Sequence, residues 1–312
     1  MKLISFVLPC HNEEKNLSPL IKEISLNVPK KYRFEVICVD DGSKDQTGKM
    51  IEQLSKKHTN IRGILFHRNF GHQKALMAGI LHSQGDAVIT MDADFQHPPK
   101  TIPKLIALWE KGHDLVRTQK ASDNNASLRM KILRKVGYPV WEWVTDRAII
   151  PGGSDFRLMS KEVTQYIREM NESEFFLRGN VQMASKNPTV VKYHVSARKF
   201  GRSSYSIKMF IDMFINGFVS FSTRPLRAMT TIGVLIFLIT ACFIFVDLTR
   251  ALILRKKIIE GWVTGISLTV LLNSIIMIHL GILSEYIAVI FKEVKRRPRF
   301  MIAKKINFEP KK

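Results

Sequence analysis

The sequence predicts an α/β fold: an open parallel sheet flanked by helices, with a C-terminal region that anchors the chain in a membrane. Two observations support this prediction. Short apolar runs alternate with stretches of helical periodicity from Met1 to Tyr193, and two long apolar runs lie in the C-terminal third of the 312 residues. Strands and helices in alternation imply right-handed crossovers between parallel strands.

Five short runs of apolar and β-branched residues have the composition of buried parallel strands. They cover residues 3–8, 35–39, 61–66, 87–91 and 114–118. Apolar residues recur at helical spacing between them, at residues 15–27, 44–57, 73–83 and 101–111. The ligand site of such a sheet lies beyond the carboxyl ends of its strands. Polar motifs that follow strands are therefore the candidates for chemistry.

The two long apolar runs are expected to form a transmembrane helix hairpin. Residues 228–246 carry no charge over about 28 Å of helix, close to the hydrocarbon thickness of a bilayer. Residues 261–284 are longer, and His279 is their only titratable side chain. A pair of buried core helices is the alternative, but both runs are apolar all round. Residues 206–222, dense in Met and Phe, are expected to lie in the membrane interface.

The charge balance favours a membrane partner over nucleic acid. Lys and Arg outnumber Asp and Glu by 48 to 27, a formal net charge of +21. Much of the excess flanks the apolar runs, where basic residues are attracted to anionic lipids. These flanks place both outer ends of the hairpin in the cytoplasm, although the basic residues 255–257 of the connecting loop oppose that orientation. The apolar part of the N-terminus is too short for a signal peptide, so we expect a multi-pass protein of the inner (cytoplasmic) membrane with a cytosolic catalytic domain.

Carboxylates follow three of the predicted strands at the point where each strand ends. Asp92 and Asp94 can share a hard divalent cation with substrate phosphate oxygens. Such a cation would neutralise a diphosphate leaving group. Asp41 can accept hydrogen bonds from a ribose or a base, and His11 and Glu13 follow the first strand. Each motif alone also fits a solvated turn, but three in order indicate one site.

This series of motifs resembles the polyprenyl-phosphate glycosyltransferases of the inverting glycosyltransferase family 2, which include dolichyl-phosphate mannose synthase and the bactoprenol glucosyltransferases. The resemblance spans nearly the whole chain and implies a GT-A (Rossmann-like) nucleotide-sugar domain. The motifs that carry it are Pro9-x-x-Asn12-Glu13, Asp40-Asp41-Gly42-Ser43, Asn69-Phe70-Gly71, Asp92-Ala93-Asp94 and Asp155-Phe156-Arg157-Leu158-Met159.

The resemblance implies a role for particular residues. The nucleoside positions match Pro9, His11, Glu13, Val39 and Asp41. The metal and diphosphate site matches Asp92, Ala93 and Asp94, with Gln96 beside it, and Asp94 is counted as catalytic as well. Asp155 matches the proposed catalytic base and Arg157 accompanies it, whereas Arg198 matches an arginine near the phosphates.

The chain departs from the family pattern at three places. Lys120 stands where an arginine is usual, and Ser154 stands where glycine is frequent. In the basic segment after Arg198, Ser204 replaces the common lysine. We expect Arg202 to supply the displaced cation and to contact the acceptor phosphate.

The expected reaction is inverting transfer of a single sugar from a nucleotide sugar to undecaprenyl or another polyprenyl phosphate, assisted by Mg²⁺ or Mn²⁺. The product would serve later modification of cell-envelope glycans such as lipopolysaccharide. Four regions are expected. They are a glycosyltransferase domain at 1–200, interfacial amphipathic helices at 201–225, a transmembrane hairpin at 226–291 and a basic cytoplasmic tail at 292–312.

The donor stays open at this point. UDP-glucose is preferred, with UDP-N-acetylhexosamine, GDP-mannose and an aminoarabinose donor as alternatives. A processive polysaccharide synthase is the closest rival, but the Gln-x-x-Arg-Trp motif of such enzymes does not occur in the sequence. A catalytically dead membrane adaptor is disfavoured by the intact Asp92 and Asp94. Membrane lipid is an expected partner, and a homo-oligomer through the transmembrane helices is a further expectation.

Overall fold

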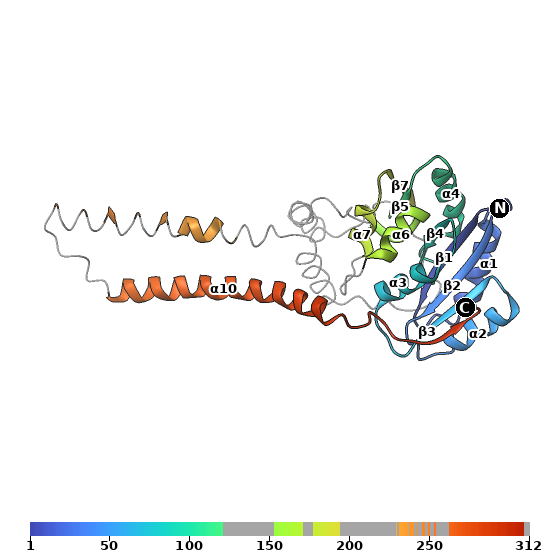
Figure 1. Cartoon of the computed structure of the whole chain (residues 1–312), viewed down its shortest axis with the longest axis horizontal. Coiled ribbons are helices and arrows are strands. Elements are labelled where there is room, and N and C mark those ends of the chain that lie inside the picture. Colours follow the sequence, from blue (N-terminus) through green and yellow to red (C-terminus); the bar gives the residue numbers. More distant parts are fainter. Residues whose placement is uncertain are drawn as a thin grey trace.

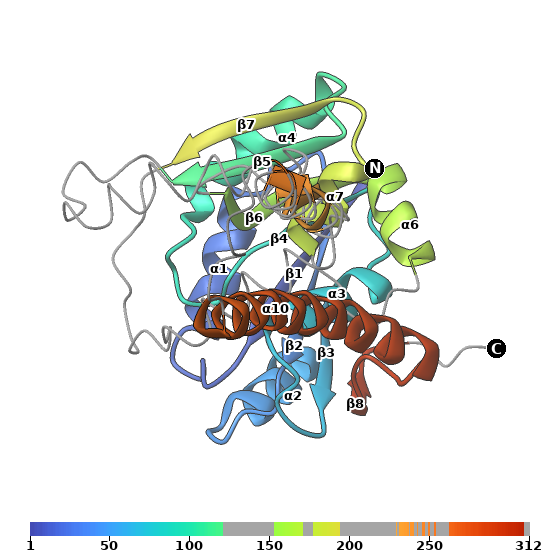
Figure 2. The ribbon, with the colours of Figure 1, turned by 90° about the vertical axis from the view of Figure 1, so that its left-hand side faces the viewer.

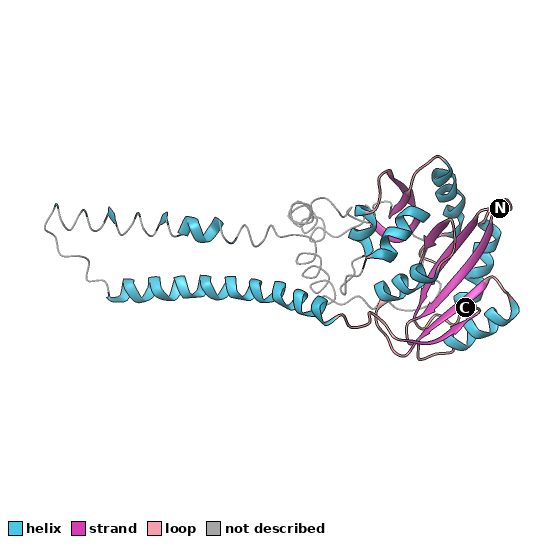
Figure 3. Ribbon diagram, in the orientation of Figure 1, coloured by secondary structure: helices cyan, strands magenta, loops and turns pink. Residues whose placement is uncertain are grey.

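The globular part of the protein is built on one eight-stranded sheet in the order β7-β5-β6-β4-β1-β2-β3-β8. The computed structural model describes residues 1–120, 153–170, 177–193 and 262–308, with single residues and short stretches between 229 and 253. The sheet lies at one end of an elongated molecule, and the long helix α10 extends away from it (Figure 1). The order of the strands can be followed from β7 to β8 in Figure 2, and Figure 3 separates strands from helices.

The bounds of the elements follow the chain. The strands are β1 (Leu3–Cys10), β2 (Arg33–Asp40), β3 (Ile61–Phe66), β4 (Ala87–Thr90), β5 (Leu115–Lys120), β6 (Gly153–Ser160), β7 (Pro188–Tyr193) and β8 (Ile302–Ile306). The described helices are α1 (Leu17–Asn27), α2 (Thr47–Lys57), α3 (His72–His82), the 3₁₀ turn η1 (Pro99–Thr101), α4 (Ile102–Glu110), α6 (Lys161–Glu169), α7 (Leu177–Met183) and α10 (Trp262–Lys295).

Helices cover both faces of the sheet, which explains why its central strands are apolar throughout. In β1, Ile4, Phe6 and Leu8 pack into the core shared with α1, α2 and α4, whereas Val7 packs with α3, α6 and α7 on the other face. Neighbouring side chains of a strand point to opposite faces. A strand buried on both sides therefore reads as a continuous apolar run.

The five predicted strands and four predicted helices are all present, but the expectation of a parallel sheet is wrong for two other strands. β6 runs antiparallel to β4 and β5, and β8 runs antiparallel to β3. Hydrophobic periodicity marks neither strand. β6 begins with polar residues of the site, and β8 carries Lys304 and Lys305.

The segment after α10 returns to the globular domain and forms an edge strand. β8 pairs with β3, and the ring of Phe300 stacks on Phe66 with centroids 5.1 Å apart. The guanidinium of Arg299 donates to the carbonyl of Met170, at the end of α6, at 2.6 Å. The region expected to be only a basic tail, 292–312, therefore completes α10 and the sheet.

Within the described part of the chain, α10 is the one helix that is long and apolar enough to cross a membrane. Its candidate span, Leu268–Lys295, has a mean hydropathy of 2.0, and only 6% of the apolar window is buried. A core helix of a soluble protein would be covered by other elements. The second expected span, 228–246, is described in part, and its described residues are helical, whereas the interfacial segment 201–225 lies wholly outside the described residues.

The close approach of α3 to β1 depends on Gly79. A Cβ atom built on Gly79 would lie 2.2 Å from Cγ1 of Val7. Val7 is β-branched and fully buried, so it has little freedom to move aside. Because α3 begins at the candidate site, this contact also fixes the position of site residues.

Gly79→Ala is expected to lower the free energy of unfolding by about 1–3 kcal/mol, the usual cost of overpacking a core. Alanine is the better helix former by about 1 kcal/mol, so a net loss would show that the clash with Val7 dominates. Thermal or denaturant unfolding of the detergent-solubilised protein measures it. Gly281→Ala in α10, where a Cβ meets nothing within 4 Å, is the matched control. Equal stability of the two variants would contradict the packing argument.

Candidate active site

The loops that follow β1 and β2 hold each other in place. The N–H of Asn12 donates to Ser43 Oγ at 2.9 Å, and the N–H of Lys44 donates to Asn12 Oδ1 at 2.9 Å. The N–H of Glu13 donates to Thr47 Oγ1 at 2.8 Å. Asn12 has a φ of 58°, a left-handed conformation that asparagine tolerates better than most residues. These bonds join the two loops into one structural unit.

Asp41 ties a third loop to this unit. Its buried carboxylate accepts the N–H of Phe70 at 2.6 Å and the N–H of Gly71 at 2.9 Å. Nδ1 of His11 lies 2.9 Å from the carbonyl oxygen of Asp41 and 3.3 Å from Nδ2 of Asn69. The structure therefore brings together His11 and Asp41, which are expected to hold the nucleoside. It also uses both oxygens of Asp41 to shape the loop before α3.

The other expected nucleoside residues lie at the same edge of the sheet. Pro9 and Val39 are paired neighbours on β1 and β2, and both are buried. Glu13 accepts a hydrogen bond from Asn16 Nδ2 at 2.6 Å. Lys120, the last residue of β5, is exposed.

The loop after β4, named the metal-binding loop for its expected role, carries Asp92 and Asp94. Asp94 is buried and accepts the N–H of Gln96 at 3.0 Å, while Phe95 between them has a φ of 66°. A non-glycine residue in this region is strained, so the surrounding structure holds the loop in shape. Ala93 is buried, and Oδ1 of Asp92 is buried without receiving a hydrogen bond.

These carboxylates fit a divalent cation that is held jointly with a substrate. A buried carboxylate oxygen that receives no hydrogen bond, as in Asp92, is stabilised by a cation. Among the described residues, no three His, Cys, Asp or Glu side chains are grouped to hold a metal. A cation bound by Asp92 and Asp94 would therefore complete its shell with water and phosphate oxygens, as Mg²⁺ commonly does.

Asp155 stands opposite the metal-binding loop because β6 is antiparallel to β4. The register pairs Thr90 with Arg157, so Asp92, two residues further along, falls opposite Asp155. Nη2 of Arg157 donates to Oδ1 of Asp155 at 2.5 Å, and Nε2 of Gln73 donates to Oδ2 at 3.3 Å. Arg157 is only 3% exposed. Its buried guanidinium therefore holds the carboxylate of Asp155 in place.

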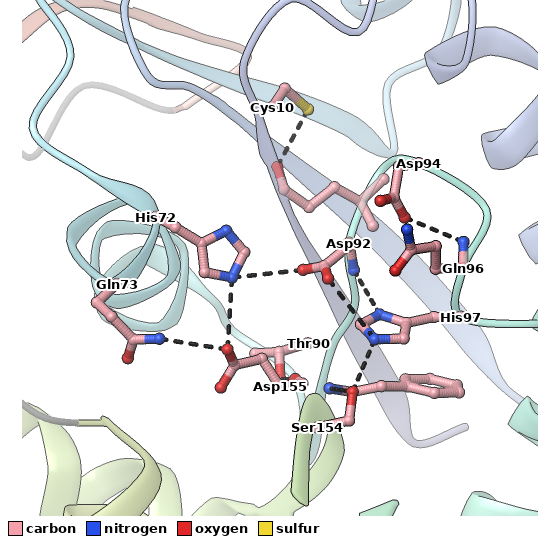
Figure 4. A network of polar contacts seen from close by, with 12 residues as sticks. Cys10, His72, Gln73, Thr90, Asp92, Asp94, Gln96, His97, Ser154 and Asp155 are labelled. Carbon is pink, nitrogen blue, oxygen red and sulfur yellow. Dashed lines mark hydrogen bonds and ion pairs between the residues drawn. The ribbon is translucent and has the colours of Figure 1, made fainter. Parts of the chain in front are cut away.

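His72, the first residue of α3, lies between the two carboxylates (Figure 4). Its Nε2 is 3.4 Å from Oδ1 of Asp92 and 3.6 Å from Oδ2 of Asp155. The partial positive charge of a helix N-terminus favours anions at this place. A protonated imidazole, together with the end of α3, would offset the repulsion between Asp92 and Asp155.

His97 is buried behind Asp92 and connects the metal-binding loop to β6. Its Nδ1 accepts the N–H of Asp92 at 2.9 Å, and its Nε2 lies 2.7 Å from Ser154 Oγ. The ring stacks on Phe156 with centroids 5.2 Å apart and meets Tyr193 edge-on. Burial lowers the pKa of His97, against the pull of nearby carboxylates. The ring is therefore neutral at neutral pH.

Sequence reasoning did not single out four of the residues that the structure brings to this site. They are His72, Gln73, His97 and Tyr193. The first two directly follow the Asn-Phe-Gly motif and His97 directly follows Gln96, so their positions beside motifs were a usable signal. Tyr193 lies on β7, far along the chain, and no motif marks it. The expected phosphate-binding residues Arg198 and Arg202 lie outside the described residues.

The expected nucleoside residues, the carboxylate pair of Asp92 and Asp94 and the carboxylate of Asp155 lie at one edge of the sheet, as the sequence predicts for a glycosyltransferase. The chain belongs to glycosyl transferase family 2, whose family model matches residues 5–167. The matched region runs from within β1 to near the end of α6, and it includes both the metal-binding loop and Asp155.

Several relatives are similar over almost their whole length. The SfII prophage-derived bactoprenol glucosyl transferase of Shigella flexneri is 33% identical over 98% of this chain and 99% of its own. The prophage bactoprenol glucosyl transferase homolog of Escherichia coli K12 is 33% identical over 96% of this chain and 98% of its own. An uncharacterized glycosyltransferase of Synechocystis is 31% identical over 96% of this chain and 94% of its own.

Solved structures are more distant. Glucosyl-3-phosphoglycerate synthase from Mycobacterium tuberculosis, in complex with Mn²⁺, UDP-glucose and phosphoglyceric acid, is 19% identical with a TM-score of 0.46. The match covers 69% of this chain and 78% of that one.

Asp41→Asn is expected to loosen the loop before α3, because one side-chain oxygen then serves two N–H groups. An unsatisfied buried donor costs about 1–3 kcal/mol, so amide exchange at Phe70 or Gly71 should accelerate by about tenfold or more. Hydrogen–deuterium exchange with peptide-level mass spectrometry measures this. Asp45→Asn, which alters an acceptor of the Thr47 N–H in the neighbouring loop, should leave both amides protected. Unchanged protection in Asp41→Asn would contradict the assignment.

Proposed function

We propose that the chain transfers a single sugar, with inversion, from a nucleotide sugar to a polyprenyl phosphate at the cytoplasmic face of a membrane. The observation that carries the proposal is the placement of Asp92 and Asp155 on either side of His72 Nε2, at 3.4 and 3.6 Å. Both substrates of such a transfer carry phosphates at the reacting point. The arrangement fits a donor diphosphate beside Asp92 and Asp94 and an acceptor phosphate beside Asp155.

The residues of the site would act mainly by holding and orienting charged groups. Asp92 and Asp94 would bind Mg²⁺ or Mn²⁺, which supplies positive charge for the departing nucleoside diphosphate. The second pKa of a phosphate monoester is about 6, so the attacking oxygen is largely ionised at neutral pH. Asp155 would therefore orient the acceptor or take its last proton, held in position by Arg157. Orientation and charge complementarity would supply most of the rate.

Glucose is the proposed sugar and polyprenol the proposed carrier. The support is the near full-length similarity to bactoprenol glucosyl transferases at 33% identity. UDP-N-acetylhexosamine, GDP-mannose and an aminoarabinose donor remain alternative donors, and a processive synthase remains an alternative mode. The matched motifs specify the nucleotide-sugar domain more strongly than the sugar.

The path of the chain after α10 supports a membrane hairpin. β8 pairs with β3 in the same sheet as the catalytic strands. The segments before and after the apolar region therefore both belong to the globular domain. That domain lies on one side of the membrane. If α10 crosses the bilayer, a second crossing must lie between Tyr193 and Trp262. Residues 228–246 have the length and composition for it.

The position of the basic residues sets the proposed side of the membrane. Lys292 and Lys295 occupy the last turn of α10, and Arg296, Arg297 and Arg299 follow before β8. Basic residues at a membrane exit favour the cytoplasmic side. In Figure 1 the N-terminus, two residues before β1, lies at the end of the domain remote from α10. β1 therefore runs toward the membrane helix, which brings its carboxyl end nearer to a lipid-borne phosphate.

Membranes containing the protein, incubated with undecaprenyl phosphate and a panel of nucleotide sugars, are expected to yield one glycolipid whose mass equals the acceptor plus one hexose. UDP-glucose is expected to be the most efficient donor. Mass spectrometry of the lipid extract reads out both the sugar and its number. A polymeric product would favour the processive alternative, and no product with any donor would overturn the proposed function.

Metal dependence gives a second prediction for the same assay. Excess chelator should abolish transfer, and added Mg²⁺ or Mn²⁺ should restore it. Asp94→Asn should reduce kcat/KM by at least about a hundredfold, because a neutral amide is a poorer ligand for a hard cation. Full activity in excess chelator would show that the two carboxylates serve another purpose.

For topology, reporter fusions at Lys312 and within residues 255–257 are expected to report opposite sides, with Lys312 in the cytoplasm. The physical reason is the pairing of β8 with β3, which keeps the C-terminal segment beside the catalytic domain. A periplasmic or extracellular signal at Lys312 would contradict an even number of crossings.

A further inference from the structure

We propose that His97 is a positioning residue that fixes the distance between the metal-binding loop and Asp155. It does so by bonding the two segments through the two nitrogens of one buried ring. The inference rests on the proposed function, because it concerns how the donor and acceptor halves of that site are held in register. It names a residue that belongs to neither half.

The hydrogen bonds of His97 determine its tautomer. A backbone N–H can only donate, so the bond of 2.9 Å from the N–H of Asp92 makes Nδ1 an acceptor. The neutral ring therefore carries its proton on Nε2. That N–H points at Ser154 Oγ, 2.7 Å away. Figure 4 shows the ring between Asp92 and Ser154: Nδ1 accepts from the backbone of Asp92, and Nε2 faces Ser154 Oγ and, at the longer distance of 3.6 Å, Oδ2 of Asp92.

The serine is itself held from several directions. Ser154 Oγ accepts the N–H of Phe156 at 3.2 Å and lies 3.2 Å from the hydroxyl of Tyr193. His97 is 2% exposed and Ser154 is 7% exposed, so neither group can exchange these partners for water. The link is therefore stiff at both ends, because the ring is also packed between Phe156 and Tyr193.

Both segments that His97 joins carry groups of the proposed site. The Asp92 residue that donates to Nδ1 also carries the expected metal-binding carboxylate, and Ser154 immediately precedes Asp155. A misplacement of about 1 Å between reacting groups can cost about a hundredfold in rate. A histidine that only filled space in the core would not need both nitrogens on these two segments.

His97 and Ser154 are the two partners of the bond that completes this link. A glycine at position 154 would offer no side-chain acceptor to the Nε2–H of His97. The serine hydroxyl supplies that acceptor in this protein. Ser154 is therefore the partner that makes His97 a connection between segments.

Two substitutions at His97 separate the two bonds. Asn can place its side-chain oxygen near the position of Nδ1, so His97→Asn keeps an acceptor for the Asp92 N–H and loses the bond to Ser154. Gln can place its amide near the position of Nε2, so His97→Gln keeps the donor to Ser154 and loses the acceptor for Asp92. A space-filling role would not distinguish the two variants.

The measurement combines binding and turnover in the full-length protein. Binding of Mn²⁺ with nucleoside diphosphate, followed by the EPR signal of free Mn²⁺, should be within about twofold of wild type in His97→Asn and about tenfold weaker in His97→Gln. Turnover at saturating donor and acceptor should fall about tenfold or more in His97→Asn, because the metal site is intact but Asp155 is displaced.

A double-mutant cycle tests whether the bond to Ser154 carries the effect. Ser154→Ala removes the acceptor, so it should reduce kcat as much as His97→Asn does. The double variant His97→Asn with Ser154→Ala should be no slower than either single variant, because both remove one connection. Losses that multiply in the double variant would show that His97 and Ser154 act independently and would overturn the proposal.

Thr118→Val is the matched control for local destabilisation. Thr118 on β5 donates from Oγ1 to the carbonyl of Phe156 on β6, the strand of Ser154, at 2.7 Å. The Thr118→Val variant should have a lower Tm than wild type, with kcat within about twofold of wild type.

Wild-type kcat in His97→Asn, or the same loss of metal binding in His97→Asn and His97→Gln, would overturn the proposal. Absence of transfer by the wild-type protein with every donor would instead count against the proposed function, and the Mn²⁺ binding measurement would still stand.

Discussion

The antiparallel insertion of β6 between β4 and β5 is the constraint on which the site depends. The parallel strands bring their carboxyl ends to one edge, and only a strand running the other way can begin its path at that edge. The pairing of Thr90 with Arg157 then sets Asp92 opposite Asp155. A slip of one residue would turn Asp155 to the other face of the sheet. Thr90 Oγ1 and Arg157 Nη2, which both bond to Asp155, hold the register in place.

The same edge collects negative charge, and the fold counters it with few positive groups. Asp41, Asp92, Asp94 and Asp155 all lie there, and each is bonded or faces a partner. Backbone N–H groups serve Asp41, and the buried guanidinium of Arg157 serves Asp155. The buried oxygen of Asp92 receives no hydrogen bond. The proposed cation would meet this oxygen at the place proposed for the donor diphosphate.

The sequence could predict those parts of the fold that leave a periodic or local signal. The parallel strands are apolar throughout because both faces are covered, and Asp92 and Asp94 follow β4 directly. It could not predict β8, whose lysines and short length carry no strand periodicity, or the antiparallel entry of β6. It also could not show that Arg157 is buried, because burial depends on the rest of the fold. The contact of His97 with Ser154 was equally hidden, because it joins residues 57 positions apart.

The central claim is that Asp92 and Asp94 together hold the cation that carries the donor diphosphate. The most direct measurement is the anomalous scattering of Mn²⁺ in crystals of the full-length protein grown with Mn²⁺ and the nucleoside diphosphate of its donor. The account predicts one peak about 2 Å from a carboxylate oxygen of each residue, Oδ1 in Asp92, with diphosphate oxygens among the remaining ligands. A peak bound by Asp155, or a diphosphate bound with no metal at Asp92 and Asp94, would contradict it.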